Sequence, residues 1–412
     1  MLAKSRGRVA MLAHTCYLND PRVRREADAL AEKGFEVHVI TLAETRQGMR
    51  EPWNTMLNGV YVHRLPVYRR RGSFLRYLYE YSMVGLLGGL KLAALHFKNK
   101  LDAVHIHNMP DVLVLAGMVP RLTGSKLILD VHDPAPELYM SWNHGTRGIV
   151  VRLLRFQEKI SCRLAHRVIS VNETMRENLR TKGVADKKIF IVHNFPDQNH
   201  FPVCELPASW RRKSDELVLL YCGTITEHYD LGLAVKAMAK LSGEIPVRLR
   251  IMGDGNRLDE VLDLAVSLGV RDSIELVGKV PIEKVGEEMK KADVGISCHR
   301  AGIFGDLYFS TKIVEYLTQG LPVITPRTYT IAKYLSDDCL FYFEPGNEEA
   351  MADAIRNIWH DPNEVLRRLN KSREILSQLS WQSEKDKFLG FYDEVLTSPT
   401  GTAAQHAWER SK

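Results

Sequence analysis

The stretch "DLYFSTKIVEYLTQGLPVITP", residues 306–326, combines a helix and a strand around one glycine. Its apolar residues first recur at helical spacing, and Ser310 stands where such a helix would begin. Gly320 ends the helical pattern, and the run "PVITP" (322–326) then has the β-branched residues of a buried strand. A strand that is apolar throughout is typical of a parallel sheet with helices on both faces.

The same alternation of apolar runs and helical segments extends along the chain, as in the helical pattern of residues 20–35 and 148–165. Before residue 200, strand-like runs lie at 8–13, 36–43, 103–108, 126–133, 167–172 and 189–194. After it, they lie at 217–223, 247–253, 273–278, 294–299 and 322–326. This rhythm predicts an α/β fold with two doubly wound, Rossmann-like domains that face each other across a cleft.

This alternation stops at residues 197–216, which are rich in proline and charged residues and show neither a helical nor a strand pattern. We therefore place a first domain at 1–200, a linker at 201–216 and a second domain at 217–380. Residues 381–396 form a separate helical pattern with an aromatic side.

Composition and cysteine spacing indicate a globular protein that is neither stabilised by disulfides nor exported. The 412 residues are 45% hydrophobic and 26% charged, which is a globular balance and enough for two cores. The six cysteines have no paired spacing, so a reducing cytosol is expected. Residues 1–13 have no long apolar run, so we do not expect export. The predicted location is cytoplasmic.

Ligands of such folds bind at the carboxyl ends of the strands. In the second domain, Ser310 would begin a helix whose free N–H groups attract an anion, and Glu315 follows within two turns. A carboxylate there can accept hydrogen bonds from sugar hydroxyls. The pattern indicates a nucleotide, with its diphosphate on the helix start and its ribose on Glu315, although Lys312 and Glu315 could also be an exposed helix-face pair.

Two histidine patterns stand out in the first domain. His132 and Asp133 follow an apolar run and should face the cleft, and a purely structural role for His132 stays open. His105 and His107 would face one side of a strand, but no carboxylate or cysteine accompanies them at ligand spacing. We therefore expect no metal.

Several segments in order, from about residue 8 to 395, resemble glycosyltransferase family 4, which has the GT-B fold. They include "LILDVHDPAPELY", "LLYCGTITEHYDLGLAVKAMAKL", "LRIMGDGNRLDEVLDLAVSLGV" and "FSTKIVEYLTQGLPVI". The last is similar to a "PxKxxEYxxxGxPVI" branch found in polysaccharide biosynthesis. The resemblance implies a retaining enzyme without cofactor or metal that moves a sugar from a nucleotide diphosphate to a saccharide or lipid-linked saccharide.

The resemblance also implies roles for the domains and for single residues. The first domain would bind the acceptor, the second would bind the nucleotide sugar, and the helix 381–396 would cross back to the first domain. His132, with Asp133 beside it, would lie next to the transferring sugar and the leaving phosphate. The donor would contact Glu315, Lys312, Thr311, Ser310, Val280, Gly253, Asp254, Gly223, Thr224 and His228.

The sequence departs from the family at several positions, among them Tyr308, where the family has the first acid of a paired-glutamate motif, and residues 13–22, a loop without the usual glycine. Thr224 and Tyr229 stand where an Arg and a Lys usually hold the phosphates. His228 and Lys312 could replace them in part, and Arg250 or Arg300 could reach in. These losses leave open a non-catalytic partner subunit, and the fold leaves open a nucleotide-sugar 2-epimerase.

Residues 67–100 combine a basic start, Arg69–Arg71 and Arg76, with an apolar middle that is broken by charges. This segment is a poor spanning helix but could lie on an anionic membrane surface at the inner face of the cell membrane, with Phe74, Tyr77 and Leu78 in the lipid. A core helix with a basic entry loop is the alternative. Nucleic acid is not expected as a partner, because no recognised binding motif accompanies the arginines.

Overall fold

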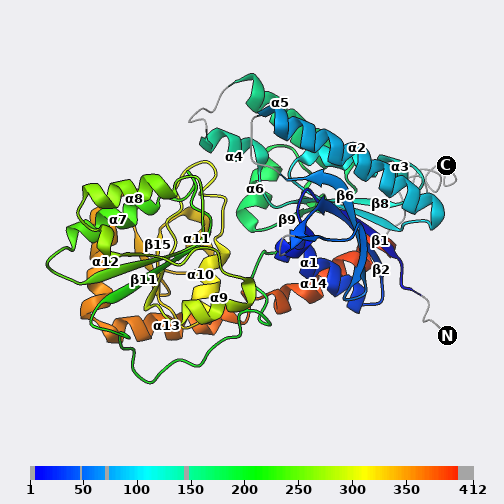
Figure 1. Ribbon diagram of the computed structural model, residues 1–412. Coiled ribbons are helices and arrows are strands. Elements are labelled where there is room, and N and C mark those ends of the chain that lie inside the picture. Colours follow the sequence, from blue (N-terminus) through cyan, green and yellow to red (C-terminus); the bar gives the residue numbers. More distant parts are fainter. Residues whose placement is uncertain (1–4, 47–48, 70–73, 143–147, 398–412) are drawn as a thin grey trace. The chain divides into compact units, whose positions relative to one another are not determined.

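A computed structural model describes residues 5–46, 49–69, 74–142 and 148–397 (Figure 1). These residues form two compact units. Unit 1 holds the described residues up to Tyr139, those from 148 to His193 and those from Glu384 onward, and unit 2 holds the others. Each unit has its own sheet, so the prediction of two parallel α/β domains is confirmed.

Unit 1 is built on an eight-stranded sheet of order β10-β9-β8-β7-β1-β2-β6-β5. All neighbours pair in parallel except β5, which runs antiparallel to β6 at one edge. Every residue of β7 and β8 is buried, so helices cover both faces of the sheet. The strands are β1 (Arg8–Leu12), β2 (Glu36–Ala43), β5 (Asn54–Leu57), β6 (Val60–Tyr68), β7 (Ala103–His107), β8 (Lys126–Val131), β9 (Arg167–Ser170) and β10 (Ile189–Ile191), with β3 (Thr45–Arg46) and β4 (Met49–Arg50) as a separate pair.

Local sequence fixes the starts of the helices in unit 1. The Asp20 carboxylate accepts hydrogen bonds from the backbone N–H groups of Arg22 and Val23, and Pro21 occupies the first helical position of α1. Asn172 caps α6 in the same way. The helices are α1 (Pro21–Glu32), α2 (Phe74–Lys98), α3 (Met118–Leu122), α5 (Ile149–Leu164) and α6 (Glu173–Thr181), with 3₁₀ turns η1 (Tyr17–Asn19), η2 (Asp111–Gly117) and η3 (Asp186–Lys188). Two further helices, α4 (Ala135–Trp142) and α14 (Trp381–Thr397), are shared by the two units.

Unit 2 has a six-stranded, wholly parallel sheet of order β13-β12-β11-β14-β15-β16. The order reverses beside β11, which is the point where ligands bind in doubly wound folds. Its strands are β11 (Leu217–Cys222), β12 (Val247–Met252), β13 (Ile274–Leu276), β14 (Val294–Ile296), β15 (Val323–Pro326) and β16 (Phe341–Phe343). Its helices are α7 (Leu231–Lys240), α8 (Leu258–Ser267), α9 (Ile282–Met289), α10 (Thr311–Thr318), α11 (Tyr329–Tyr334), α12 (Glu348–His360) and α13 (Pro362–Leu376), with η4 (Arg271–Ser273).

The segment expected to link the domains packs onto unit 2. Phe201 and Trp210 are part of the core of this unit. The backbone N–H of Cys204 donates to the carbonyl of Thr318 over 2.8 Å, and the N–H of Lys213 donates to the Asp293 carboxylate over 3.0 Å. Residues 201–216 are therefore held along their length, and the two units divide earlier, between His193 and Asn194.

The helix expected at 381–396 is α14, and from Glu384 onward it belongs to unit 1. Phe388 and Tyr392 are fully buried there, and the Tyr392 hydroxyl hydrogen-bonds to Nδ1 of His105 over 2.8 Å. The ring of Phe391 stacks on Phe190 with centroids 4.7 Å apart. The last helix of the chain thus completes the core of the first unit.

Replacing Phe388 with alanine should lower the free energy of unfolding by about 3–5 kcal/mol, because the buried ring leaves a cavity. Urea unfolding followed by circular dichroism measures this change. Asp386→Ala, at an exposed position of the same helix, should stay within about 0.5 kcal/mol of the unaltered protein. Equal effects of the two changes would mean that α14 does not contribute to the core.

Candidate functional site

In unit 2, the predicted donor residues gather at the carboxyl edge of the sheet. Gly223 follows β11, Gly253 follows β12, and α10 begins after Ser310. Because β11 and β12 are parallel neighbours, their ends meet at one edge. Val280 follows β13, the next strand along, and packs partly buried against the core.

The loops after β11 and β12 are joined by their backbones. The N–H of Gly223 donates to the carbonyl of Met252 over 3.0 Å, and that of Ile225 donates to Asp254 over 3.1 Å. A Cβ on Gly253 would lie 1.8 Å from the Gly223 carbonyl oxygen, and one on Gly255 would lie 1.8 Å from that of Ile225. Glycine is therefore required at both ends of the "GDG" turn, because the backbones of the two loops approach each other closely there. The Asp254 carboxylate points outward and pairs with exposed Lys279 at 3.0 Å.

Ser310 lies at the N-cap of α10 and is buried, but its hydroxyl makes no capping hydrogen bond. Thr311 and Lys312 form the first helical positions and are half-buried. The position predicted for the helix start is confirmed, while the side-chain cap is not formed.

Lys312 and Glu315 form a close pair, with the ammonium 2.9 Å from Oε2 of Glu315. Only 6% of Glu315 is exposed, so the alternative of an exposed helix-face pair is wrong. Burial would lower the pKa of Lys312, but the Glu315 carboxylate outweighs it and raises that pKa. Both charges also act on the Cys222 thiol at the end of β11, whose pKa burial raises to about 11. The backbone N–H of Cys222 donates to the hydroxyl of Tyr316 over 2.7 Å, so α10 lies beside the end of β11.

Aromatic side chains lie near Tyr229, which with Thr224 stands where the resembled family usually has a basic residue. Thr224 is exposed, and the Tyr229 hydroxyl donates to that of Tyr308 over 3.3 Å. The ring of Phe304 lies 5.7 Å from that of Tyr308 and 5.2 Å from the imidazole of His228. His228 is therefore held beside this aromatic group.

The two arginines considered as replacements are engaged elsewhere. Arg250 lies on β12 and pairs with Glu275 at 3.0 Å and with Glu288 at 3.1 Å. Arg300 lies 3.7 Å from Asp230. Among the predicted donor residues, Lys312 is thus the cation nearest to Glu315.

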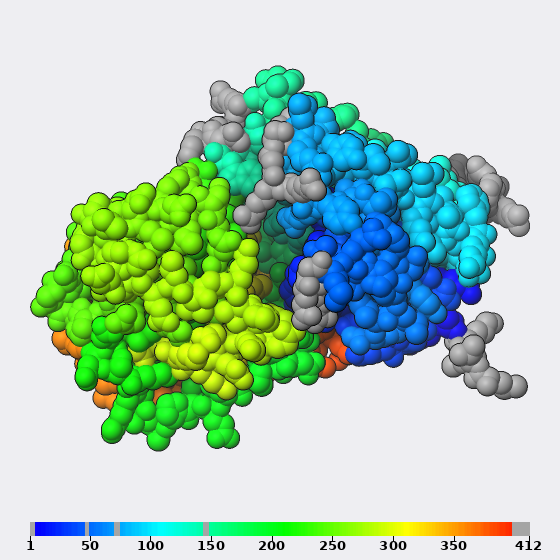
Figure 2. Space-filling model, viewed as in Figure 1, coloured from blue at the N-terminus to red at the C-terminus, as the bar shows by residue number. Residues whose placement is uncertain are grey.

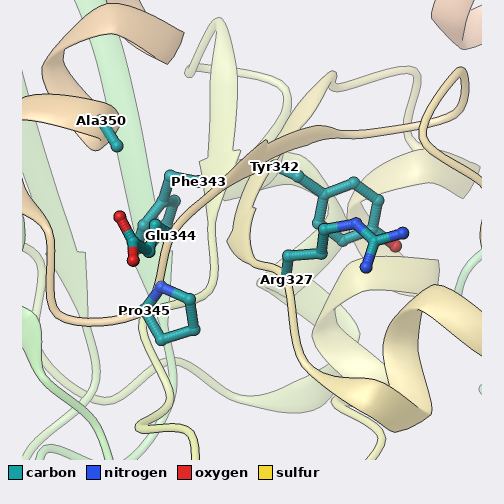
Figure 3. A pocket seen from close by; sticks show the side chains of 6 residues that line it. All are labelled: Arg327, Tyr342, Phe343, Glu344, Pro345 and Ala350. Carbon is teal, nitrogen blue, oxygen red and sulfur yellow. The ribbon is translucent and has the colours of Figure 1, made fainter.

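A separate pocket of unit 2 lies at the ends of β15 and β16 (Figure 3). The guanidinium of Arg327 lies over the ring of Tyr342 on one side, 5.9 Å from its centroid. Phe343, Glu344 and Pro345 lie on the other side. This pocket contains none of the predicted donor residues.

In unit 1, His132 follows β8 and is held by neighbouring polar groups. Its backbone N–H donates to Oδ1 of Asn108 over 3.1 Å, and that of Asp133 donates to the same oxygen over 3.3 Å. Its Nδ1 lies 3.5 Å from Oδ2 of Asp130. Burial would lower the pKa of His132, but the Asp130 carboxylate outweighs it and raises that pKa.

Asp130 is the centre of a buried charge network. Arg22 on α1 donates to both of its oxygens, over 2.7 and 3.0 Å, and Nδ1 of His107 lies 3.1 Å from Oδ2. Arg22 also lies 3.2 Å from Glu26. Burial raises the pKa of Glu26, whereas the charge of Arg22 overcomes burial and holds the pKa of Asp130 well below its usual range. His132 therefore faces an ionised carboxylate.

The expectation that no carboxylate accompanies His105 and His107 is wrong. Glu26, from α1, and Asp130, from β8, come together with them, and possible ligand atoms of the four lie within 4.8 Å of one another. Both Asp130 oxygens are bound by Arg22, so a metal ion would have to compete with a guanidinium. The absence of a metal stays a prediction.

Replacing Gly255 with alanine should destabilise unit 2 by more than about 3 kcal/mol, because the new Cβ would overlap the rigid backbone of Ile225. Gly286→Ala is the matched control. It lies in α9, where a Cβ would meet nothing closer than 3.5 Å, and should be neutral or stabilising by up to about 1 kcal/mol. Chemical unfolding of the two variants measures the difference, and equal stability would contradict the close approach.

Asp130→Asn should lower the pKa of His132, because it removes the carboxylate that raises this pKa and leaves the burial that lowers it. The imidazolium of His132 should then be lost at a lower pH than in the unaltered protein. An NMR titration of the imidazole protons measures this pKa, with His132→Gln to assign the signal. An unchanged pKa would show that Asp130 does not set the charge of His132.

Comparisons with known proteins match both halves of the chain. The family described as "Glycosyl transferase 4-like domain" matches residues 20–194, and "Glycosyl transferases group 1" matches residues 204–375. N-acetyl-alpha-D-glucosaminyl L-malate synthase of Bacillus anthracis is 21% identical over 371 residues, which is 89% of this chain and 90% of the relative.

Solved structures agree on the fold. Sucrose-phosphate synthase from Thermosynechococcus elongatus superposes with a TM-score of 0.76 at 17% identity, covering 96% of this chain and 100% of that one. HepE of Anabaena, in complex with UDP, superposes with a TM-score of 0.67 at 14% identity, covering 94% and 100%. The chain therefore belongs to the group 1 glycosyltransferases of the GT-B fold, with a family 4-like first domain.

Proposed function

We propose that this glycosyltransferase moves a sugar, with retention of configuration, from a nucleoside diphosphate to a saccharide or lipid-linked saccharide. The observation that carries the proposal is the pair of half-buried Lys312 and buried Glu315, which lies on α10, the helix that contacts the end of β11. A buried carboxylate at a ligand-binding edge can accept two hydroxyl hydrogen bonds, and an adjacent ammonium can hold a phosphate. UDP, present in the structure of HepE, is the first nucleotide to test.

Each proposed donor residue has a role that follows from its chemistry. Glu315 accepts hydrogen bonds from the ribose hydroxyls, and Lys312, Thr311 and Ser310 hold the diphosphate together with the N–H groups of the first turn of α10. The loops at Gly223–Thr224 and Gly253–Asp254, whose backbones approach each other closely at Gly253, place backbone groups next to the nucleotide. Val280 borders the base, and His228 lies next to the phosphates.

In this proposal, His132 acts at the departing phosphate, with Asp133 beside it. As the bond to the anomeric carbon breaks, negative charge grows on the diphosphate oxygen. Lys312, the N–H groups of α10 and an imidazolium at His132 stabilise that charge without a metal ion. Asp130 favours the imidazolium, because its carboxylate raises the pKa of His132.

The acceptor is proposed to be bound by the first unit and to be membrane-linked, with the enzyme on the cytoplasmic face. No helix within the described residues is long and apolar enough to span a bilayer. The contact proposed from sequence lies in residues 67–100, where Arg76 pairs with buried Glu80 and the side chains of Tyr77 and Leu78 are exposed. Arg70 and Arg71 lie outside the described residues.

A thermal-shift screen against UDP, GDP, ADP, CMP and dTDP, with and without magnesium, tests the donor site. One nucleoside diphosphate should raise the melting temperature without magnesium, because it binds only the folded protein. Glu315→Gln should weaken that binding about tenfold or more, because one acceptor oxygen and the charge are lost.

Glu374→Gln is the matched control, because Lys371 and Glu374 form the same i,i+3 pair on the exposed side of α13. This variant should keep the full shift. If none of the nucleotides raises the melting temperature, or if the two variants respond equally, the donor site is not where we propose it.

A further inference from the structure

Helix α5 turns its apolar stripe toward solvent. Ile149, Leu153, Phe156 and Ile160 recur at spacings of four, three and four, and so form one stripe along the helix. They are 70%, 58%, 62% and 37% exposed. A helix of a globular protein normally buries such a stripe, but α5 buries a different side, which carries Val151, Glu158, Ser161 and Cys162.

Exposed apolar side chains also lie on neighbouring elements of unit 1. The turn η2 packs against both α5 and α2, and α3 packs against α2. Leu115 of η2 and Leu122 of α3 are exposed, as are Leu86 and Leu90 of α2. Figure 1 has α2, α3 and α5 on one side of unit 1, and Figure 2 shows the light-blue and cyan atoms of α2 and α3 along that side. We call the exposed side of α2, η2, α3 and α5 the outer apolar face.

The exposed charges of this face are positive. Arg152, Arg155, Lys159 and Arg163 are exposed on α5 between the apolar positions. The acidic residues of the described parts of these four elements are Glu80, Asp111 and Glu158, and each is at most 1% exposed. An exposed apolar stripe whose charged neighbours are all basic fits a partner that has an anionic surface and an apolar interior.

We propose that the outer apolar face binds the surface of an anionic lipid bilayer, with the stripe of α5 in the acyl boundary and its basic side chains on the headgroups. Long basic side chains can bury their stems while their charges stay in water. A second copy fits poorly, since a two-fold contact of α5 with itself would bring like charges together. The contact thereby extends from α2 to α5, a segment that the sequence did not single out.

This inference deepens the proposed function, because a lipid-linked acceptor requires the enzyme at a membrane, but its test does not depend on transfer. The full chain is sedimented with vesicles of phosphatidylcholine, with or without phosphatidylglycerol, at low and high salt. Binding should require phosphatidylglycerol and should fall at high salt.

Two α5 variants and two controls complete the experiment. Leu153→Ser with Phe156→Ser should weaken vesicle binding more than about tenfold, because two large side chains no longer enter the lipid. Arg152→Glu with Lys159→Glu should abolish the preference for phosphatidylglycerol. The controls are Val266→Ser with Leu268→Ser and Lys284→Glu with Lys290→Glu, which change exposed residues of unit 2 and should bind as the unaltered protein does.

The proposal is overturned if the unaltered protein does not sediment with anionic vesicles at low salt, or if both α5 variants bind as well as their controls. A dimer in solution that Leu153→Ser with Phe156→Ser converts to monomer would also overturn it, because a second copy would then cover the face. Melting temperatures check that each variant folds. If a nucleotide still raises the melting temperature of the α5 variants, their donor site is intact. A loss of vesicle binding can then be told apart from a failure of the proposed donor site.

Discussion

Parallel pairing of buried strands is the constraint on which both units depend. A parallel strand cannot be reached by a hairpin, so the chain must return through a helix, and every strand then ends at the same edge. Loops at that edge come from distant parts of the sequence. In unit 2 this brings the turn at Gly253, the loop at Gly223 and the helix α10 together. The position of the proposed donor site is thus a consequence of topology, which brings the ends of distant strands together.

In unit 1 the same edge holds a buried charge network, which would be costly if its charges were unpaired. Arg22 offsets the burial of Asp130 with two hydrogen bonds and lies beside Glu26 as well. Because these groups come from α1 and β8, the network fixes the position of a helix against the strand that ends at His132. A hydrophobic replacement could be as stable, but it would not leave a carboxylate facing that imidazole.

The sequence predicted most of the parallel strands, because most of them are short apolar runs between helical segments. It did not predict β5, β6 or β16: β6 alternates between buried and exposed residues, β5 has no buried residue, and β16 is only three residues long. The carboxylates beside His105 and His107 were also missed, because spacing within one segment cannot reveal partners from α1 and β8. The periodicity of α5 predicted a helix, but periodicity alone does not say which side of a helix faces solvent.

Thr224 and Tyr229 stand where the resembled family usually has an arginine and a lysine, and the charged residues of unit 2 show which groups could act in their place. In the proposed donor site, a loop with two fewer cations would hold the phosphates by other means, and Arg250 and Arg300 lie beside carboxylates. Lys312 remains beside Glu315, so one carboxylate keeps the ammonium charged and in place before a donor binds. When ribose hydroxyls donate to Glu315, that ammonium can turn to a phosphate. Binding of the ribose and of the phosphates of a nucleotide would then be coupled through one ion pair, and this coupling would replace part of what an arginine and a lysine at these two positions would provide.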